Sequence, residues 1–247
     1  MLNNKEIEQL RKNALVHKKV FEEIKKTVKV GTSAEEIDKL CGHIAKENNV
    51  LCGFKGVYDF PANICISVND CVVHGVPRKG IIFKKGDLVK FDFGIKDKKY
   101  GVNTDAAISI IIGGDHTNEV AARLIETSKK ALYAGIEKAK DGNRVGDISS
   151  SIQQEVEGAG FKIIKELSGH GIGYNLHEKP YIYNYGKAGT GQILKEGMTI
   201  AIEPIIGETS GEIYDKGSWE IYVKDGSLGC QFEHTVLITS GDAEIII

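Results

Sequence analysis

The chain lacks the features that mark several specialised classes of protein. Its five cysteines are odd in number and include no CxxC pair, so neither a disulfide framework nor a zinc ribbon is indicated. No apolar run is long enough to span a membrane, and the charged N-terminus MLNNKEIEQLRKN has no apolar core like that of a signal peptide. The sequence therefore predicts a cytoplasmic protein, in a reducing compartment, with no membrane partner.

The chain also carries little net charge. A formal net charge of −2 gives no argument for a DNA-binding surface. Gly113 and Gly114 follow an apolar run, but no GxGxxG or Walker pattern surrounds them, so phosphate binding is not predicted. With 41% hydrophobic and 27% charged residues, the chain has the composition of an ordinary soluble globular protein. We expect a single domain over residues 1–247.

The order of the predicted elements favours an α+β fold. A helix over 4–29 is followed by a second helix, for which Ser33 is the N-cap and Glu36 stands in the capping-box position. Further strands are predicted over 64–68, 88–95 and 102–112, helices over 116–139 and 146–159, and strands over 197–206, 218–224 and 230–240. Runs of helices and strands favour α+β over a βαβ alternation. The two halves repeat this order, which indicates an internal pseudo-symmetry.

The segment SGHGIGYNLHEKP, residues 168–180, carries two histidines seven positions apart. Three glycines in five residues, with a proline at the end, argue against a helix. On a flat strand, an odd separation would send the rings of His170 and His177 to opposite faces. We therefore expect a strand end or loop that approaches another group closely, with the two rings arriving from different points along it.

Four acidic residues stand in short apolar strand segments: Asp92, Asp105, Glu203 and Glu233. If the strands around Asp92 and Asp105 pair about a turn between Lys98 and Lys99, these two carboxylates face each other directly and repel unless a cation or proton lies between them. Pro204 cannot donate to a sheet ladder, so Glu203 is expected at a strand end or bulge. A single acid on a strand is usually solvated, but four unpaired buried carboxylates would be prohibitively costly.

A metal site accounts for these acids. Four carboxylates with the imidazole of His170 make an oxygen-rich set that suits a pair of divalent first-row ions. Two such ions would balance the four negative charges, share a water, lower its pKa and hold an oxyanion. The glycines around His170 would let the backbone approach the metals, and His177 would be left free as a hydrogen-bond donor or acid/base.

These residues resemble a known family. Asp92, Asp105, the GHGIG…HE.P pattern, IEP with Glu203 and QFEHT with Glu233 are similar to type I methionine aminopeptidases of metallopeptidase family M24. The resemblance runs nearly end to end and includes VVHGVP, residues 72–77, and Trp219. It implies the pita-bread fold of the creatinase/prolidase superfamily, a pseudo-two-fold antiparallel sheet covered by helices. It also implies removal of the initiator methionine from nascent polypeptides.

The resemblance implies a role for each candidate residue. Asp92 would chelate one metal, Asp105 and Glu233 would bridge two, and His170 and Glu203 would hold the other. The ions would be Co, Mn or Fe(II), with a monovalent cation as a further candidate. A metal-bridged water or hydroxide would attack the carbonyl that follows the methionine. His177 would stabilise the oxyanion, His74 would contact the scissile nitrogen, and Glu203 would also shuttle protons. The methionine pocket would be lined by Cys65, Phe54 and Phe60, with Trp219 near its entrance.

The chain departs from the family in three places. The family spaces its two aspartates eleven residues apart, whereas Asp92 and Asp105 are thirteen apart. This leaves their parity unchanged, but a bulge would weaken the assignment of Asp105. The segment FKGVYDFP is a few residues longer than usual, and Leu176 stands where many relatives have phenylalanine, which concerns the shape of the pocket.

Two alternative functions stay open on the sequence. A proline-specific peptidase of the same fold usually carries an additional N-terminal domain, and this chain begins almost directly with the catalytic half. A catalytically inactive relative would serve as a binding module, but such relatives lose metal ligands. A monomer is expected, and a transient contact with the ribosome is a further candidate.

Overall fold

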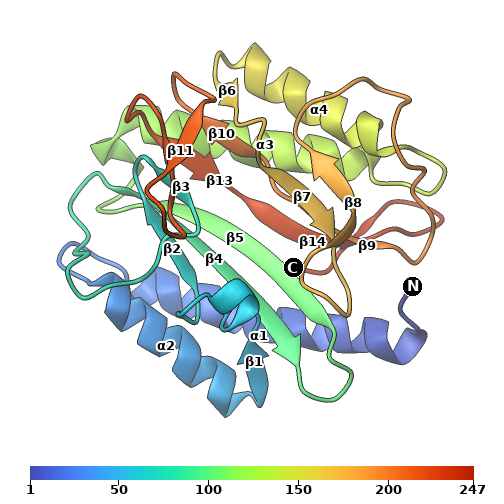
Figure 1. Ribbon diagram of the computed structural model, residues 1–247, viewed down its shortest axis with the longest axis horizontal. Helices are drawn as coiled ribbons and strands as arrows, with labels where there is room; N and C mark the ends of the chain where they lie inside the picture. The colour runs from blue at the N-terminus through green and yellow to red at the C-terminus, as the bar shows by residue number, and fades with distance from the viewer.

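The structure, a computed structural model that describes residues 1–247, combines four α-helices with short antiparallel strands (Figure 1). The helices are α1 (Asn4–Thr27), α2 (Ala34–Glu47), α3 (Glu119–Lys138) and α4 (Val145–Gly158). Two 3₁₀ turns, η1 (Val57–Asp59) and η2 (Asp115–Thr117), stand between longer elements. The predicted α+β class is therefore confirmed. None of these helices combines the length and the apolarity that a membrane crossing requires.

The main sheet has nine strands, and every pair in it is antiparallel. Its order is β1 (Val50–Cys52), β4 (Leu88–Asp97), β5 (Asn103–Ile111), β14 (Glu233–Leu237), β9 (Thr199–Ile202), β7 (Ser168–Gly171) and β8 (Glu178–Tyr183). Two further strands join it, because β2 (Cys65–Val68) pairs with β4 and β15 (Glu244–Ile245) pairs with β14. The sheet thus brings strands of the two chain halves together between β5 and β14.

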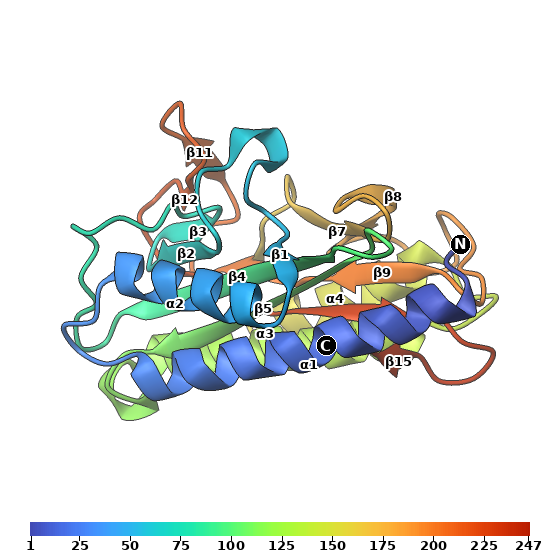
Figure 2. The ribbon, with the colours of Figure 1, turned by 90° about the horizontal axis from the view of Figure 1, so that it is seen from below.

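Two small sheets complete the fold. One consists of β13 (Gly229–Gln231), β10 (Ile205–Gly207) and β6 (Lys162–Ile163), and the other of β11 (Ile213–Asp215), β12 (Ile221–Val223) and β3 (Cys71–Val73). Figure 2 shows β3, β11 and β12, together with the turn of η1, on the opposite side of the main sheet from α1. This opposite side holds the candidate site.

The helices cover one face of the main sheet in two similar halves. Helices α1 and α2 bury their apolar stripes in one core cluster with Phe91 and Phe93 of β4. Helices α3 and α4 do the same in a second cluster with Ile200 and Ile202 of β9. The repetition of a helix pair over an antiparallel sheet agrees with the pseudo-symmetry that the order of elements predicts.

Polar caps fix where the helices begin. Ser33 caps α2, and its hydroxyl accepts from the Glu36 backbone N–H while the Glu36 carboxylate accepts from the Ser33 N–H, as predicted. Helix α1 ends at Thr27, two residues before the predicted boundary. Helix α3 starts three residues later than predicted, because Asn118 accepts from the Ala121 N–H and so caps the helix there.

Two predicted strands are each divided in two, which corrects the sequence-based boundaries. The segment 197–206 breaks at Glu203 and Pro204, between β9 and β10, and the segment 230–240 breaks at Phe232, between β13 and β14. Side chains satisfy carbonyls at the first break: Asn184 donates to the Glu203 oxygen at 2.9 Å and Ser128 to the Pro204 oxygen at 3.2 Å. The chain leaves the main sheet there and joins a small one, so the predicted strand end at Glu203 is confirmed.

The register of the β4–β5 hairpin also differs from the prediction. Asp92 pairs with Ala107, and Asp105 pairs with Gly94, so the two acids are not directly opposite and the turn is not centred between Lys98 and Lys99. The cause is the carboxylate of Asp97, which accepts from three backbone N–H groups of residues 99, 100 and 102 at 2.8 Å each and closes a longer turn. The shift is even, so both acids still share one face.

Candidate metal centre

The uncovered face of the main sheet carries the predicted acids in neighbouring rows. The first row runs across four strands through Cys65, Asp92, Ala107 and Glu233, each paired with the next. Directly paired residues point to the same face. The single methyl of Ala107 leaves open space between the carboxylates of Asp92 and Glu233.

The second row places Asp105 and His170 on the same face. Asp105 pairs with Gly94, and the hydroxyl of Thr235 fastens its backbone, accepting from the Asp105 N–H at 2.8 Å and donating to the Asp105 oxygen at 2.7 Å. Thr235 in turn pairs with Ala201, and Ala201 pairs with His170. Small side chains therefore alternate with the functional ones across the sheet.

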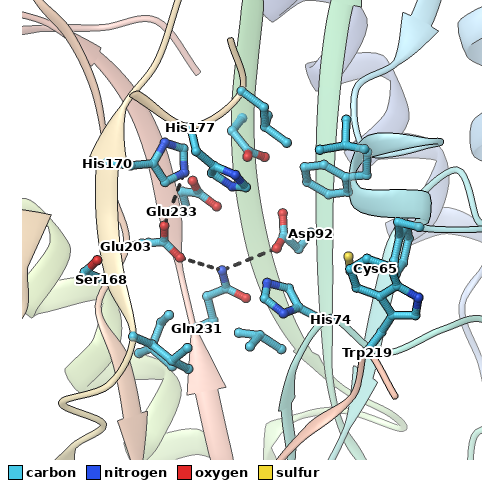
Figure 3. Close-up of a pocket in the computed structure, with 18 of the residues that line it drawn as sticks. Cys65, His74, Asp92, Ser168, His170, His177, Glu203, Trp219, Gln231 and Glu233 are labelled. Carbon is cyan, nitrogen blue, oxygen red and sulfur yellow. Dashed lines mark hydrogen bonds and ion pairs between the residues drawn. The ribbon is translucent and has the colours of Figure 1, made fainter. Parts of the chain in front are cut away.

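An amide from a small sheet joins the two ends of the acid cluster. The Nε2 of Gln231, on β13, donates to Oδ2 of Asp92 at 3.4 Å and to Oε2 of Glu203 at 3.2 Å (Figure 3). Glu203 stands at the break after β9, and its Oε1 lies 3.5 Å from Nε2 of His170. The four carboxylates and the imidazole thus converge on one small volume.

The carboxylates are held without enough positive charge to balance them. Burial, followed by repulsion from neighbouring carboxylates, raises the pKa of Asp105, Glu203 and Glu233 well above the usual range, and burial raises the pKa of Asp92 as well. None of the four pairs with a lysine or arginine. The buried oxygens Asp92 Oδ1, Asp105 Oδ1 and Glu233 Oε1 have no hydrogen-bond partner. Such a cluster needs cations or protons from outside the chain.

The Nε2 atom of His170 can offer a lone pair to this acid cluster. Its Nδ1 lies 2.9 Å from the Gly171 carbonyl oxygen, which can only accept, so Nδ1 carries the proton and Nε2 is bare. Burial, followed by the neighbouring ring of His177 with its centroid 4.5 Å away, lowers the pKa of His170 to about 3. The imidazole is therefore neutral at neutral pH, the form that coordinates metals.

The residues present fit divalent metal ions. Ligand atoms of Asp105, His170 and Glu233 all lie within 4.8 Å of one another. Oxygen donors with one imidazole suit first-row divalent ions, whose charge would also satisfy the unpartnered carboxylate oxygens. The five residues predicted as ligands lie together despite the unusual spacing of Asp92 and Asp105.

The glycines around His170 serve a different purpose from the predicted one. A Cβ on Gly169 would lie 2.3 Å from the Ala201 oxygen, and a Cβ on Gly171 would lie 2.4 Å from the Lys179 oxygen. The absence of a side chain at both glycines therefore allows neighbouring strands, and not the metals, to pack closely against β7. His170 itself lies on β7 and His177 precedes β8, so the prediction of a strand end with rings arriving from different points is confirmed.

Gly169→Ala is expected to destabilise the protein by about 2–4 kcal/mol, because the added methyl would push β7 away from β9. Gly173→Ala is the matched control, since its Cβ meets nothing closer than 3.4 Å, and it should change the free energy of unfolding by less than about 1 kcal/mol. Urea denaturation of the two variants measures the difference. Equal losses would contradict this account of β7.

A cavity of about 360 Å³ opens over the acid cluster. Its apolar end is a slot formed by Phe54, Phe60, Cys65, Leu176 and Trp219. The rings of Phe60 and Trp219 meet edge to face, with centroids 5.6 Å apart. Gly94 leaves room for the Phe54 ring, because a Cβ there would lie 2.6 Å from it. The predicted pocket residues thus line one slot beside the acids.

His74 and His177 lie on the wall of the same cavity. Burial, with a smaller contribution from His177, lowers the pKa of His74 to about 4. His74 also has a φ of 59°, a left-handed conformation that costs energy for a residue other than glycine and often occurs at functional sites. His177 is exposed at the mouth, and burial on one side lowers its pKa. The ring of His74 is therefore neutral at neutral pH.

Several lining residues were not predicted from the sequence, among them Tyr58, Tyr181 and Gln231. Tyr58, on η1, lies parallel to the His177 ring at an interplanar angle of 4° and a centroid distance of 6.0 Å. Tyr181 belongs to an alternation of exposed tyrosines with buried residues on β8, which the sequence pattern could have indicated. Gln231 directly precedes the strand break at Phe232 and opens the QFEHT motif, which could have indicated it, although only Glu233 of that motif is given a role by the sequence.

Comparison with known proteins places the chain in a family. Residues 8–240 match the model of metallopeptidase family M24. The methionine aminopeptidase of Clostridium acetobutylicum is 37% identical over 99% of this chain and 96% of its own length. The crystal structure of methionine aminopeptidase from Thermotoga maritima superposes with a TM-score of 0.95 at 38% identity, covering 99% of this chain and 97% of that one. The chain belongs to the methionine aminopeptidases of family M24. It is a metallo-aminopeptidase, a hydrolase.

The wider family shares the fold of this aminopeptidase. Prolidase from Pyrococcus furiosus superposes with a TM-score of 0.79 at 25% identity, covering 99% of this chain but 64% of that one. The predicted pita-bread architecture of the creatinase/prolidase group is therefore confirmed.

Proposed function

We propose that this aminopeptidase removes the initiator methionine from nascent polypeptides by hydrolysis at a dinuclear metal centre. The observation that carries the proposal is the position of an apolar slot directly beside five buried ligand-type side chains. The similarity to methionine aminopeptidases over almost the full chain supports the same substrate. Residues 1–247 would form one catalytic domain that acts as a monomer in the cytoplasm, where its five free cysteines stay reduced.

The metal ions would be held by Asp92, Asp105, His170, Glu203 and Glu233, with Asp105 and Glu233 central among them. Divalent ions there, Mn, Co or Fe(II), supply Lewis-acid polarisation of a carbonyl and lower the pKa of water. Gln231 would keep the carboxylates of Asp92 and Glu203 in place through its two hydrogen bonds. Burial of the cluster excludes bulk water and strengthens its electrostatic interactions.

The slot would bind the methionine side chain. Phe54, Phe60 and Leu176 give an apolar lining, and the sulfur of Cys65 is a soft neighbour for a thioether. With Trp219 at the entrance, the residue to be removed would be anchored in the slot and its carbonyl held over the acid cluster.

Three residues would then assist the reaction. His177, at the mouth, would donate to the carbonyl oxygen as negative charge develops on it. His74, neutral at neutral pH, would hydrogen-bond near the scissile nitrogen. Glu203, whose pKa is raised by burial, can take up and release a proton and so carry it toward the leaving amine.

His177→Ala is expected to lower kcat by about 10²–10³-fold with little change in KM, because an oxyanion donor acts mainly in the transition state. His43→Ala is the matched control: His43 is exposed on α2 and pairs only with Glu47, so its loss should leave both constants unchanged. Steady-state kinetics on a methionyl peptide measures the effects of both substitutions on kcat and on KM separately. A large rise in KM at constant kcat would assign His177 to substrate binding alone.

Mass spectrometry of the peptide Met-Ala-Ser, incubated with metal-stripped protein, tests the proposal. Mn(II), Co(II) or Fe(II) is added back separately, the last without oxygen, and a proline-containing dipeptide such as Ala-Pro serves as the alternative substrate. Loss of one methionine that depends on added metal supports the proposed function. Cleavage of Ala-Pro alone would favour a proline-specific peptidase, and no cleavage by folded protein would favour a binding module.

A further inference from the structure

Three tyrosines form a stripe along β8 and just beyond it. Tyr181 and Tyr183 are 53% and 43% exposed, and Tyr185 is partly exposed. They alternate with buried residues, namely Pro180, Ile182 and Asn184. Large aromatic side chains repeated on an open sheet face are unusual where nothing is bound, because aromatic surface is costly to leave in water. The one tyrosine hydroxyl that hydrogen-bonds within the chain belongs to Tyr174, which lies outside the stripe and donates to Glu6.

This tyrosine stripe begins inside the candidate site. In the β7–β8 pairing, Tyr181 stands opposite His170, and Tyr183 stands opposite Ser168. Paired residues share a face, so Tyr181 and Tyr183 lie on the face that holds the acids, whereas Tyr185, beyond the strand, also packs against the core cluster under α3 and α4. Tyr181 and Ser168 also line the cavity over the acid cluster. The stripe therefore continues the site outward without a break.

The stripe leads from the site along an edge of the main sheet. The strand order ends at β8, so no further strand pairs with its outer side (Figure 1). Helix α4 contacts β8 from the helix-covered side, where Ile182 is buried. At the far end, Nζ of Lys165 lies 5.5 Å from the centre of the Tyr185 ring. The face that carries the exposed tyrosines and the unpaired outer edge are therefore the open parts of β8.

The spacing of the rings matches an extended polypeptide. Centroids of Tyr181 and Tyr183 are 6.4 Å apart, and those of Tyr183 and Tyr185 are 5.8 Å apart. Alternate residues of an extended chain repeat at roughly 6.6 Å. Tyrosine offers a large amphipathic surface at low entropic cost, and it tolerates varied sequences because it binds through ring contacts and a single hydroxyl.

We propose that the tyrosine stripe binds the unfolded segment of the substrate polypeptide downstream of the scissile bond, over about four to six residues. The occupant follows from continuity: a polypeptide whose methionine fills the slot must leave the cavity, and Tyr181 stands on its wall. The inference rests on the proposed function and extends it, because it makes the enzyme favour long extended substrates over short ones.

The test compares kcat/KM on Met-Ala-Ser and on an uncharged ten-residue peptide with the same first three residues. The double variant Tyr183→Ser/Tyr185→Ser leaves the cavity-lining Tyr181 in place. We expect the native enzyme to prefer the long peptide about tenfold, the double variant to lose that preference through KM, and the tripeptide to be cleaved equally by both. Tyr214→Ser is the matched control, since Tyr214 is 39% exposed on β11 and does not line the cavity, and it should keep the preference.

Each other outcome overturns the inference. A preference for the long peptide that survives in the double variant, or no preference in the native enzyme, shows that the stripe does not bind the substrate. Equal losses on both peptides assign the tyrosines to the fold of the site. A native dimer that the double variant converts to a monomer, seen by light scattering, makes the stripe an interface between two copies. Failure of the native enzyme to cleave even Met-Ala-Ser would remove the proposed function and this extension together.

Discussion

Asp105→Asn is expected to abolish methionine release and, at the same time, to make the metal-free protein more stable. Asp105 is buried beside Asp92 and Glu203, whose charges add to burial in raising its pKa. Removing one of four mutually repelling carboxylates should raise the free energy of unfolding of the metal-free form by about 0.5–3 kcal/mol, the usual size of a single-substitution effect. Mutating a residue that only hydrogen-bonds to a metal ligand lowers activity by up to about 10²-fold. Because Asp105 would be a ligand itself, its loss should lower activity by more than about 10²-fold.

The two effects must be measured on the same preparation. Thermal unfolding is followed in a chelator and again with Mn(II), and turnover is followed on Met-Ala-Ser. The variant should also lose the stabilisation that Mn(II) gives to the native chain. Asp115→Asn is the matched control, because Asp115 is exposed on η2 and should affect neither property. A metal-free Asp105→Asn protein that is less stable than the native one would show that the carboxylates are neutralised within the chain.

The second large effect concerns pH. The four carboxylates have raised pKa values in the folded protein, so the folded state binds more protons than the unfolded state, and stability is lost as pH rises through the folded pKa values. The buried histidines act in the opposite sense, but only below about pH 6.5, where unfolded histidine takes up protons. Burial lowers the pKa of Lys90 to about 8, so Lys90 makes the folded protein more stable with rising pH only above about pH 8.

Between about pH 6.5 and 8 the carboxylates therefore dominate, and the metal-free protein should become less stable as pH rises. Saturating Mn(II) should remove or reverse this trend, because metal binding requires deprotonated ligands and strengthens with pH. Urea denaturation at three pH values, with chelator and with Mn(II), measures how the free energy of unfolding changes with pH in each condition. A metal-free protein whose stability rises across this range would contradict the proposed charge imbalance.

The sequence predicts the helices and the acids well because their signals are local. Ser33 and Glu36, which are three positions apart, predict the start of a helix, and Pro204 predicts a strand end beside Glu203. An acid in an apolar strand is likewise visible without knowledge of the rest of the chain. These local signals, together with the family resemblance, are enough to predict all five candidate metal ligands.

Other features depend on contacts between distant segments, which no local pattern carries. The register of the β4–β5 hairpin is set by Asp97 closing its own turn, and the glycines beside His170 are explained only by the strands that lie against them. Gln231 acquires its position from two acids far away in sequence. The left-handed conformation of His74 and the parallel ring of Tyr58 likewise emerge only when β3 and η1 stand over the sheet.

We expect residues from both halves of the chain to hold divalent ions together at the base of the apolar slot. Anomalous X-ray scattering at the manganese edge, from crystals grown with Mn(II), tests it most directly. We expect two neighbouring peaks enclosed by Asp92, Asp105, His170, Glu203 and Glu233. Absence of density among these side chains at saturating Mn(II), or peaks bound only elsewhere on the surface, would contradict it.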